Sequence, residues 1–195
     1  MLGAIKYNLA NLTNFNGRDA RQTFWYYVLL IIVARFAASM AVSIPMMAGA
    51  IGSAVSAAQQ GSDPAAAQAQ MMSQMSEFMP RMMWFALAVG VITALLLVAS
   101  FVRRLHDSDL SGWWAALPFA LHAYALSQVP AQMDKAIALM NSISTSATPP
   151  NPMTMMQGQG LMALVTYLPL IIGVILAVRK SSEGANRFGD NPVSF

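Results

Sequence analysis

Residues able to do chemistry gather in three short polar segments of an otherwise apolar chain. The first reads FNGRDARQTFW and contains Arg18, Arg21 and Trp25. The second reads RRLHDSDLSGWW and contains Arg103, Arg104, His106, Asp107, Asp109, Trp113 and Trp114. The third reads NRFGDNP and contains Asn186, Arg187 and Asp190. Because guanidinium groups bind carboxylates through paired hydrogen bonds, these segments predict a network of ion pairs.

The adjacent pair His106 and Asp107 also suggests acid–base or metal-dependent hydrolytic chemistry. A metal site needs three or more ligands, however, and the chain has two histidines and no cysteine. It also lacks the nucleophile-elbow, Walker and zincin motifs. We therefore expect no catalytic residue, no cofactor and no metal, and keep a membrane enzyme using His106 and Asp107 as an alternative.

The elements that must position these segments are long and apolar. Of the 195 residues, 56% are hydrophobic and 10% are charged, against roughly 25% charged in a soluble domain. Crossing a bilayer takes about 20 apolar residues, and four stretches qualify: 24–48, 82–102, 113–130 and 160–178. They exclude a soluble globular domain and a disordered chain. They predict one all-α domain over residues 1–195, an integral membrane four-helix bundle, with a disordered cytoplasmic tail over 181–195.

The basic residues predict how this bundle is oriented. Segments 1–23, 103–112 and 179–195 hold eight Lys and Arg residues, whereas segments 49–81 and 131–159 hold two. Positive charge favours the cytoplasmic side, so we expect a multi-pass inner-membrane protein with both termini in the cytoplasm. These juxtamembrane cations also predict contact with anionic lipid headgroups, and we expect no nucleic-acid partner.

Two polar residues interrupt the predicted spans. Arg35 lies within 24–48 and His122 within 113–130. An ionisable residue inside the bilayer is costly unless it is paired or hydrated, which favours a functional role. A small-solute or ion pathway using Arg35 and His122 is therefore an alternative function. The competing interpretation places residues 24–35 in an interfacial helix and starts the span near Phe36.

The two predicted outer loops are rich in methionine. Asp63 and Pro64 form a helix start, and the apolar residues between Met71 and Met82 follow helical spacing. This amphipathic helix either lies on the outer surface or extends the second span. A second one is predicted around 133–140, followed by a flexible loop over 142–152. Thioethers suit Cu(I), but the apolar-stripe interpretation is simpler because no His or Cys accompanies these methionines.

The three polar segments together resemble a family of bacterial inner-membrane proteins known as domain of unknown function 805. Its motifs F-x-G-R-x-x-R-x-x-F-W, R-R-L-H-D-x-x-x-S-G-W-W and N-R-[YF]-G-x-[DN]-P match this chain in order, from Phe15 to Pro192. The resemblance implies a multi-pass inner-membrane protein and no established reaction. Arg35 and the long methionine-rich loops depart from the family pattern.

These observations favour a non-enzymatic scaffold. The residues of the three segments would form a cytoplasmic charged–aromatic platform that packs the helices and docks a protein partner, a second copy of the chain or anionic lipid.

Overall fold

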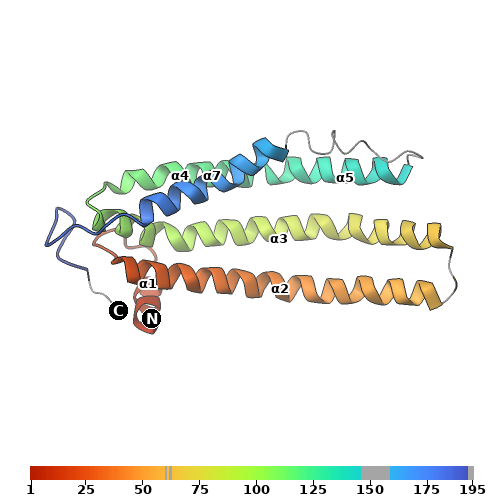
Figure 1. Ribbon diagram of the computed structural model, residues 1–195, viewed down its shortest axis with the longest axis horizontal. Coiled ribbons are helices and arrows are strands. Elements are labelled where there is room, and N and C mark those ends of the chain that lie inside the picture. The colour runs from red at the N-terminus through yellow and green to blue at the C-terminus, as the bar shows by residue number, and fades with distance from the viewer. Residues whose placement is uncertain (60, 62, 146–158, 193–195) are drawn as a thin grey trace. The chain divides into compact units, whose positions relative to one another are not determined.

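The computed structural model describes residues 1–59, 61, 63–145 and 159–192. Within these ranges the regular secondary structure is helical, apart from one isolated bridge between Asn186 and Gly189 (Figure 1). The elements are α1 (Leu2–Ala10), α2 (Arg21–Gln59), α3 (Pro64–Asp107), the 3-10 helix η1 (Gly112–Ala115), α4 (Ala116–Ser127), α5 (Val129–Thr145) and α7 (Gln159–Ala177). The all-α prediction is confirmed for this part of the chain.

The chain divides into two compact units. The first comprises residues 1–34, 89–127 and 158–195, and the second comprises residues 35–88 and 128–157. Helices α2 and α3 each contribute to both units. Whether the two units form the single membrane domain expected over 1–195 stays a prediction.

The two longest helices contain the first two predicted spans. Residues 24–48 lie within α2 and residues 82–102 within α3, and both helices are apolar and long enough to cross a membrane. Helix α3 begins at Pro64, because proline fits a first helical turn. The methionine-rich segment is therefore the first part of α3 and is continuous with the helix that contains residues 82–102.

The other two predicted spans differ in outcome. Helix α7 (Gln159–Ala177) covers the stretch 160–177, but its apolar part, Met162–Ala177, is shorter than the two helices that are long enough to cross a membrane. The stretch 113–130 is divided between two segments. The first consists of η1 followed by α4, which ends at Ser127, and the second is α5, which begins at Val129 with Pro130 in its first turn. Helix α4 alone is about 18 Å long, which is shorter than a bilayer core. Helix α5 confirms the helix expected around 133–140. Of the loop expected over 142–152, residues 142–145 are helical and the rest lies outside the described residues.

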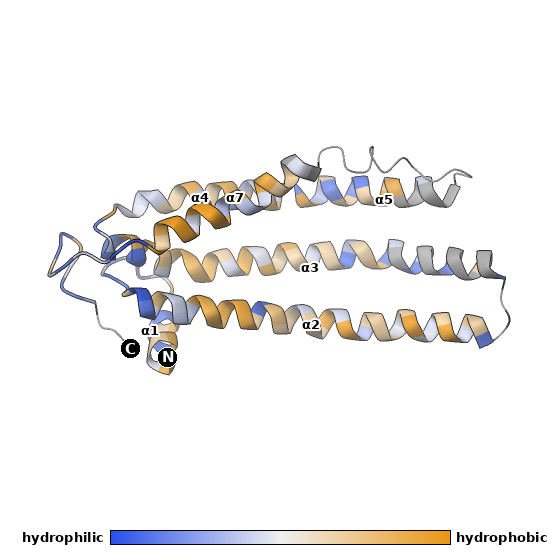
Figure 2. Cartoon of the chain, in the orientation of Figure 1, coloured by the Kyte–Doolittle hydropathy of each residue, from blue (hydrophilic) through white to orange (hydrophobic). Residues whose placement is uncertain are grey.

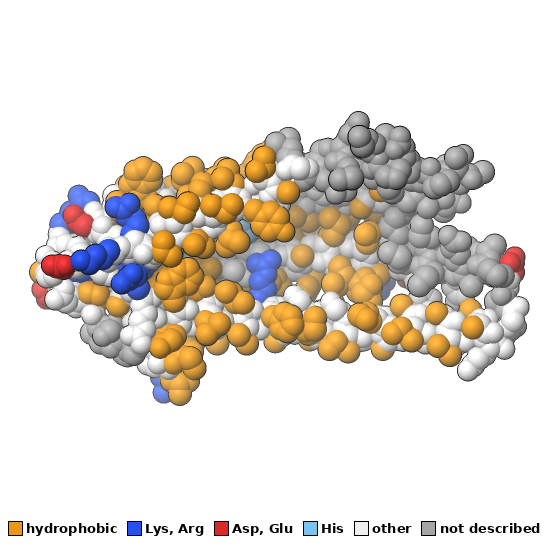
Figure 3. Space-filling view, in the orientation of Figure 1, with side chains coloured by type: hydrophobic (Ala, Val, Ile, Leu, Met, Phe, Trp, Pro, Cys, Tyr) orange, Lys and Arg blue, Asp and Glu red, His pale blue; other side chains and the backbone are white. Residues whose placement is uncertain are grey.

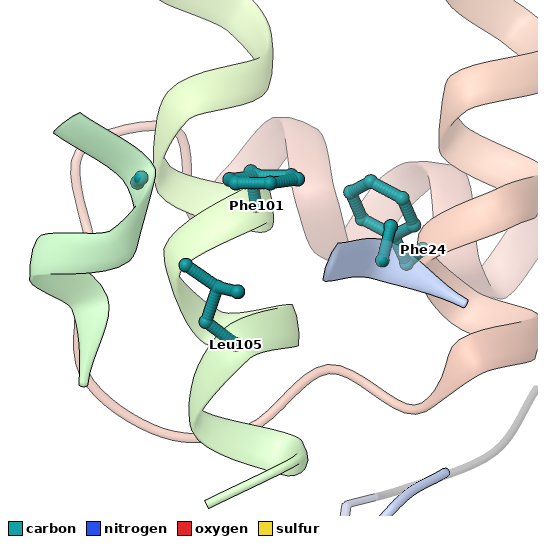
Figure 4. Close-up of a cluster of buried hydrophobic side chains, with 5 residues drawn as sticks. Phe24, Phe101 and Leu105 are labelled. Carbon is teal, nitrogen blue, oxygen red and sulfur yellow. The ribbon is translucent and has the colours of Figure 1, made fainter. Parts of the chain in front are cut away.

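A small hydrophobic cluster fixes the elements of the first unit. It contains Phe24 of α2, Phe101 and Leu105 of α3, Ala115 of η1 and Ala177 of α7 (Figure 4). The Phe24 and Phe101 ring centroids are 6.1 Å apart. Because each element adds a side chain, the end of α3 is packed between the start of α2, η1 and the end of α7.

Most of the remaining apolar surface faces outward. In the most apolar stretch of α2 only 11% of residues are buried, and in that of α3 only 28%. Figure 2 shows α7 and the part of α2 after its first turn as predominantly hydrophobic. A core helix of a soluble protein would instead be mostly buried.

Candidate functional site

Five charged residues form a buried group, which we term the arginine–aspartate cluster: Arg18, Asp19, Arg103, Arg104 and Asp107. None of the five is more than 5% exposed. Arg18 and Asp19 lie in the segment before α2, and the other three lie in the last turns of α3. Residues three and four positions apart share a face of a helix, which brings Asp107 alongside Arg103 and Arg104.

In the first half of the cluster, Arg103 binds Asp19. Arg103 Nε donates to Asp19 Oδ1 at 2.9 Å, and Ser100 Oγ donates to Asp19 Oδ2 at 2.8 Å. The backbone N–H of Asp19 donates to the Arg103 carbonyl at 3.1 Å. Burial raises the pKa of the Asp19 carboxyl, while the hydrogen bonds and charge of Arg103 act in the opposite direction. Asp19 is therefore held in place through side chain and backbone together.

The remaining donors of Arg103 hold the N-terminal segment. Nη2 donates to Asn8 Oδ1 at 2.8 Å, and Nη1 donates to the carbonyls of Asn11 and Asn14. The guanidinium also lies 5.5 Å from the ring centroid of Tyr7. A single side chain of α3 thus ties α1 and the turn after it to the cluster.

In the second half, Asp107 binds two arginines. Arg18 Nη2 donates to Asp107 Oδ1 at 3.0 Å, and Arg104 Nη1 donates to Oδ2. The Ser181 hydroxyl also donates to Oδ2. Arg104 further donates from Nε to the Ala177 carbonyl at 2.9 Å and from Nη2 to the Arg179 carbonyl. Ala177 is the last residue of α7, where the helix dipole favours a cation, and Arg179 follows two residues later.

The C-terminal tail is part of this arrangement. Arg18 Nη1 donates to the Gly184 carbonyl at 2.7 Å, and Arg18 Nη2 donates to the Ser182 carbonyl at 3.0 Å. The backbone N–H of Ser182 donates to the Asp107 carbonyl at 2.8 Å. We expected a disordered tail over 181–195. Instead, Ser181, Ser182, Gly184 and Gly189 are hydrogen-bonded to the cluster, and residues 193–195 lie outside the described part.

His106 contacts the tail at Asn186 and Phe188 and does not pair with Asp107. Its ring stacks on Phe188, with centroids 3.9 Å apart and planes 3° from parallel. Its Nδ1 hydrogen-bonds to the Gly17 carbonyl at 3.2 Å. Asn186 Nδ2 donates to the His106 carbonyl at 2.8 Å. The two residues that suggested a catalytic dyad therefore make separate contacts.

Gly112 allows the turn after α3 to fold against that helix. A Cβ atom at this position would lie 2.8 Å from Val102 Cγ1 and 3.1 Å from His106 Nε2. Both distances are shorter than ordinary van der Waals contact, so only glycine fits without a shift.

The expected charged–aromatic platform is a surface in part only. Trp113 is 86% exposed and Trp114 53% exposed. Arg21 and Asp190 are exposed and Trp25 is half-buried. Asp109 and Arg187 form an exposed ion pair of 3.2 Å. The expectation that Arg18, Arg103, Arg104 and Asp107 also lie on a docking face is wrong, because the cluster buries them and uses their hydrogen bonds internally.

The two intramembrane candidates are described separately, since they belong to different units. Arg35 is exposed on α2, and His122 is half-buried on α4. Over the described residues, no group of three or more His, Cys, Asp or Glu side chains could hold a metal ion.

Several residues of the site carry no sequence signal of their own. Asn8, Asn11, Ser100, Ser181 and Ser182 are contributors of this kind. Their types are common in turns and helices, and only the fold brings them to a guanidinium or carboxylate. Asp19 was also missed as a site residue, although it is a charged residue next to Arg18 in the first motif.

The fold and the cluster define a class of protein. It is a helical protein whose two longest helices are apolar enough to cross a membrane, and whose chain segments meet in a buried ion-pair cluster. The chain belongs to the family described as "Protein of unknown function (DUF805)", whose model matches residues 12–190. The search of curated proteins and the search of solved structures found no match.

Proposed function

We propose that the protein is a non-enzymatic, multi-pass scaffold of the bacterial inner membrane with both termini in the cytoplasm. In this proposal the arginine–aspartate cluster is architectural. It joins the N-terminal segment, the end of α3 and the C-terminal tail into one folded cytoplasmic face. The observation that carries the proposal is that the guanidinium and carboxylate groups of this cluster all form hydrogen bonds with other groups of the same chain.

The membrane location is supported by where the apolar and charged side chains lie. Large apolar residues are exposed along α2 and α7, such as Ile32 at 57%, Leu170 at 63% and Ile175 at 60%. On the first unit, charged side chains gather where α2 begins and α7 ends (Figure 3). Lipid would cover the apolar faces, and water would reach the charged end.

The non-enzymatic role is supported by the state of the candidate reactive groups. Both carboxylates of the cluster accept hydrogen bonds from arginine and serine side chains. His106 is stacked and hydrogen-bonded. A general acid or base must reach a substrate, and these contacts leave the groups engaged in holding the fold.

In-cell photocrosslinking tests the docking part of the proposal. A photoreactive residue at Asp190 or Trp113, both exposed, should give a discrete crosslinked species with a protein partner or a second copy. The same residue at Lys135, in the second unit, serves as the control.

A crosslink that depends on an intact cluster reflects specific docking, whereas a crosslink from chance contact would not depend on it. Arg104→Glu should abolish the crosslink from Asp190, since the tail is held through this cluster. Unchanged crosslinks in Arg104→Glu, or equal crosslinks from Lys135, would contradict the proposal.

A further inference from the structure

Two arginines of the first unit stand apart from the buried cluster. Arg21 and Arg179 are exposed, and neither guanidinium forms an ion pair within the described part of the chain. By contrast, Lys180 pairs with Glu183 at 2.9 Å and Arg187 pairs with Asp109 at 3.2 Å. Arg21 and Arg179 are thus available to bind an anion.

The fold brings these two arginines to the same end of the first unit. Arg21 precedes Phe24 by three residues, and Arg179 follows Ala177 by two. Phe24 and Ala177 belong to the same hydrophobic cluster. Arg104 connects them as well: it donates to the Arg179 carbonyl, and its charge is close enough to that of Arg21 for the two to repel.

This end also carries a local excess of positive charge. The buried cluster contains three guanidinium groups and two carboxylates. Arg21 and Arg179 add two more cations beside it. Carbonyls at the end of α7 offset part of this charge, but an anion outside the chain is the natural counterpart of the exposed arginines.

The surroundings indicate which kind of anion fits. The arginines adjoin apolar faces of α2 and α7, where Leu29 is 49% exposed and Ile175 60% exposed. Trp114, which neighbours Ala115 of the hydrophobic cluster, is 53% exposed. Tryptophan is enriched where a bilayer meets water. A ligand here meets cations, an aromatic ring and apolar surface together.

We infer that Arg21 and Arg179 bind the phosphate headgroup of an anionic phospholipid whose acyl chains lie along the exposed faces of α2 and α7. This inference rests on the membrane location in the proposed function. The interaction would bind the start of α2 to the end of α7 through the lipid. It also gives the cytoplasmic end of the first unit a preference for anionic over zwitterionic lipid.

Tryptophan quenching by brominated lipid tests the inference on the purified full-length protein in a neutral detergent. Brominated phosphatidylglycerol should quench at a lower mole fraction than brominated phosphatidylcholine. Each arginine near an anionic headgroup contributes about fivefold. The variant Arg21→Gln/Arg179→Gln should therefore lose about thirtyfold of the preference, and added salt should weaken the preference of the wild type.

A matched control removes two exposed cations from the second unit. Arg81→Gln/Lys135→Gln makes the same change of charge at exposed positions and should keep the wild-type preference. Equal quenching by the two lipids would overturn the inference. So would an unchanged preference in Arg21→Gln/Arg179→Gln, or complete competition by soluble glycerol phosphate.

Alkaline extraction of membranes distinguishes a failure of the lipid site from a failure of the proposed function. A protein that is extracted as soluble contradicts the proposed function itself. A protein that stays in the membrane but shows no preference for phosphatidylglycerol contradicts only the lipid site.

Discussion

Replacing Asp107 by asparagine should be among the most destabilising single changes in the protein. Asp107 accepts hydrogen bonds from Arg18, Arg104 and Ser181, and its side chain is fully buried. Asparagine keeps the shape but removes the charge and turns an amide donor toward one of these donors. Two buried guanidinium groups then lose their shared carboxylate. Removing one partner of a buried ion pair costs about 3–5 kcal/mol.

Asp109 provides a matched control two residues along the chain. It pairs with Arg187 at 3.2 Å, but the two side chains are 53% and 61% exposed. An exposed pair contributes at most about 1 kcal/mol. Asp109→Asn is the same chemical change in the same turn, so the difference between the two variants isolates the effect of burial.

The assay is reversible unfolding in mixed micelles, followed by helical circular dichroism. A double-mutant cycle that combines Asp107→Asn with Arg104→Met measures the coupling between the two side chains. Much of the cost of Asp107→Asn comes from an uncompensated charge, so the double variant should be more stable than the sum of the single effects. Equal stability of Asp107→Asn and Asp109→Asn, or simple additivity in the cycle, would refute the reasoning.

Three further predictions test separate contacts. Gly112→Ala should destabilise the protein by about 1–3 kcal/mol, because the new methyl group would meet α3. Gly173→Ala, where no atom lies within 4 Å of a Cβ, should be neutral or stabilising in the same unfolding assay. Phe188→Ala removes the stack on His106 and should speed hydrogen exchange in the tail; unchanged exchange would contradict the anchoring role. Burial raises the pKa of Tyr7, so folding stability should fall as the pH rises above about 10, and Tyr7→Phe should reduce that fall.

The positions of the helices followed well from apolar length and from a few terminal signals. Residues 82–102 contain no charged or amide side chain, and such a stretch can only be long apolar helix or deep core. Pro64 after Asp63 marked the start of α3 correctly. The division of 113–130 was missed, because Ser127 and Gln128 dilute the stretch only slightly. Helix α4 ends at Ser127 because Pro130 fits the first turn of a new helix, α5.

The sequence predicted that the site would consist of ion pairs, but it did not predict that these pairs would be buried. Paired arginines and aspartates in short segments indicated ion pairs, and the pairs of Arg18, Arg103 and Arg104 are present. Burial of the charged residues was not predictable, since Arg and Asp side chains are ordinarily exposed to solvent. The tail closes over the cluster through backbone carbonyls of Ser182 and Gly184, and carbonyls carry no sequence information.

In the proposed membrane arrangement, the cluster marks the cytoplasmic end of a membrane-embedded helical protein. The chain contains no cysteine, so single cysteines can report its topology directly. Gln59→Cys, after the long apolar part of α2, and Asp190→Cys, in the tail, are both at exposed positions. A membrane-impermeant maleimide applied to intact spheroplasts should label Gln59→Cys at once and Asp190→Cys only after the membrane is permeabilised. Labelling of Asp190→Cys in intact spheroplasts would contradict the account.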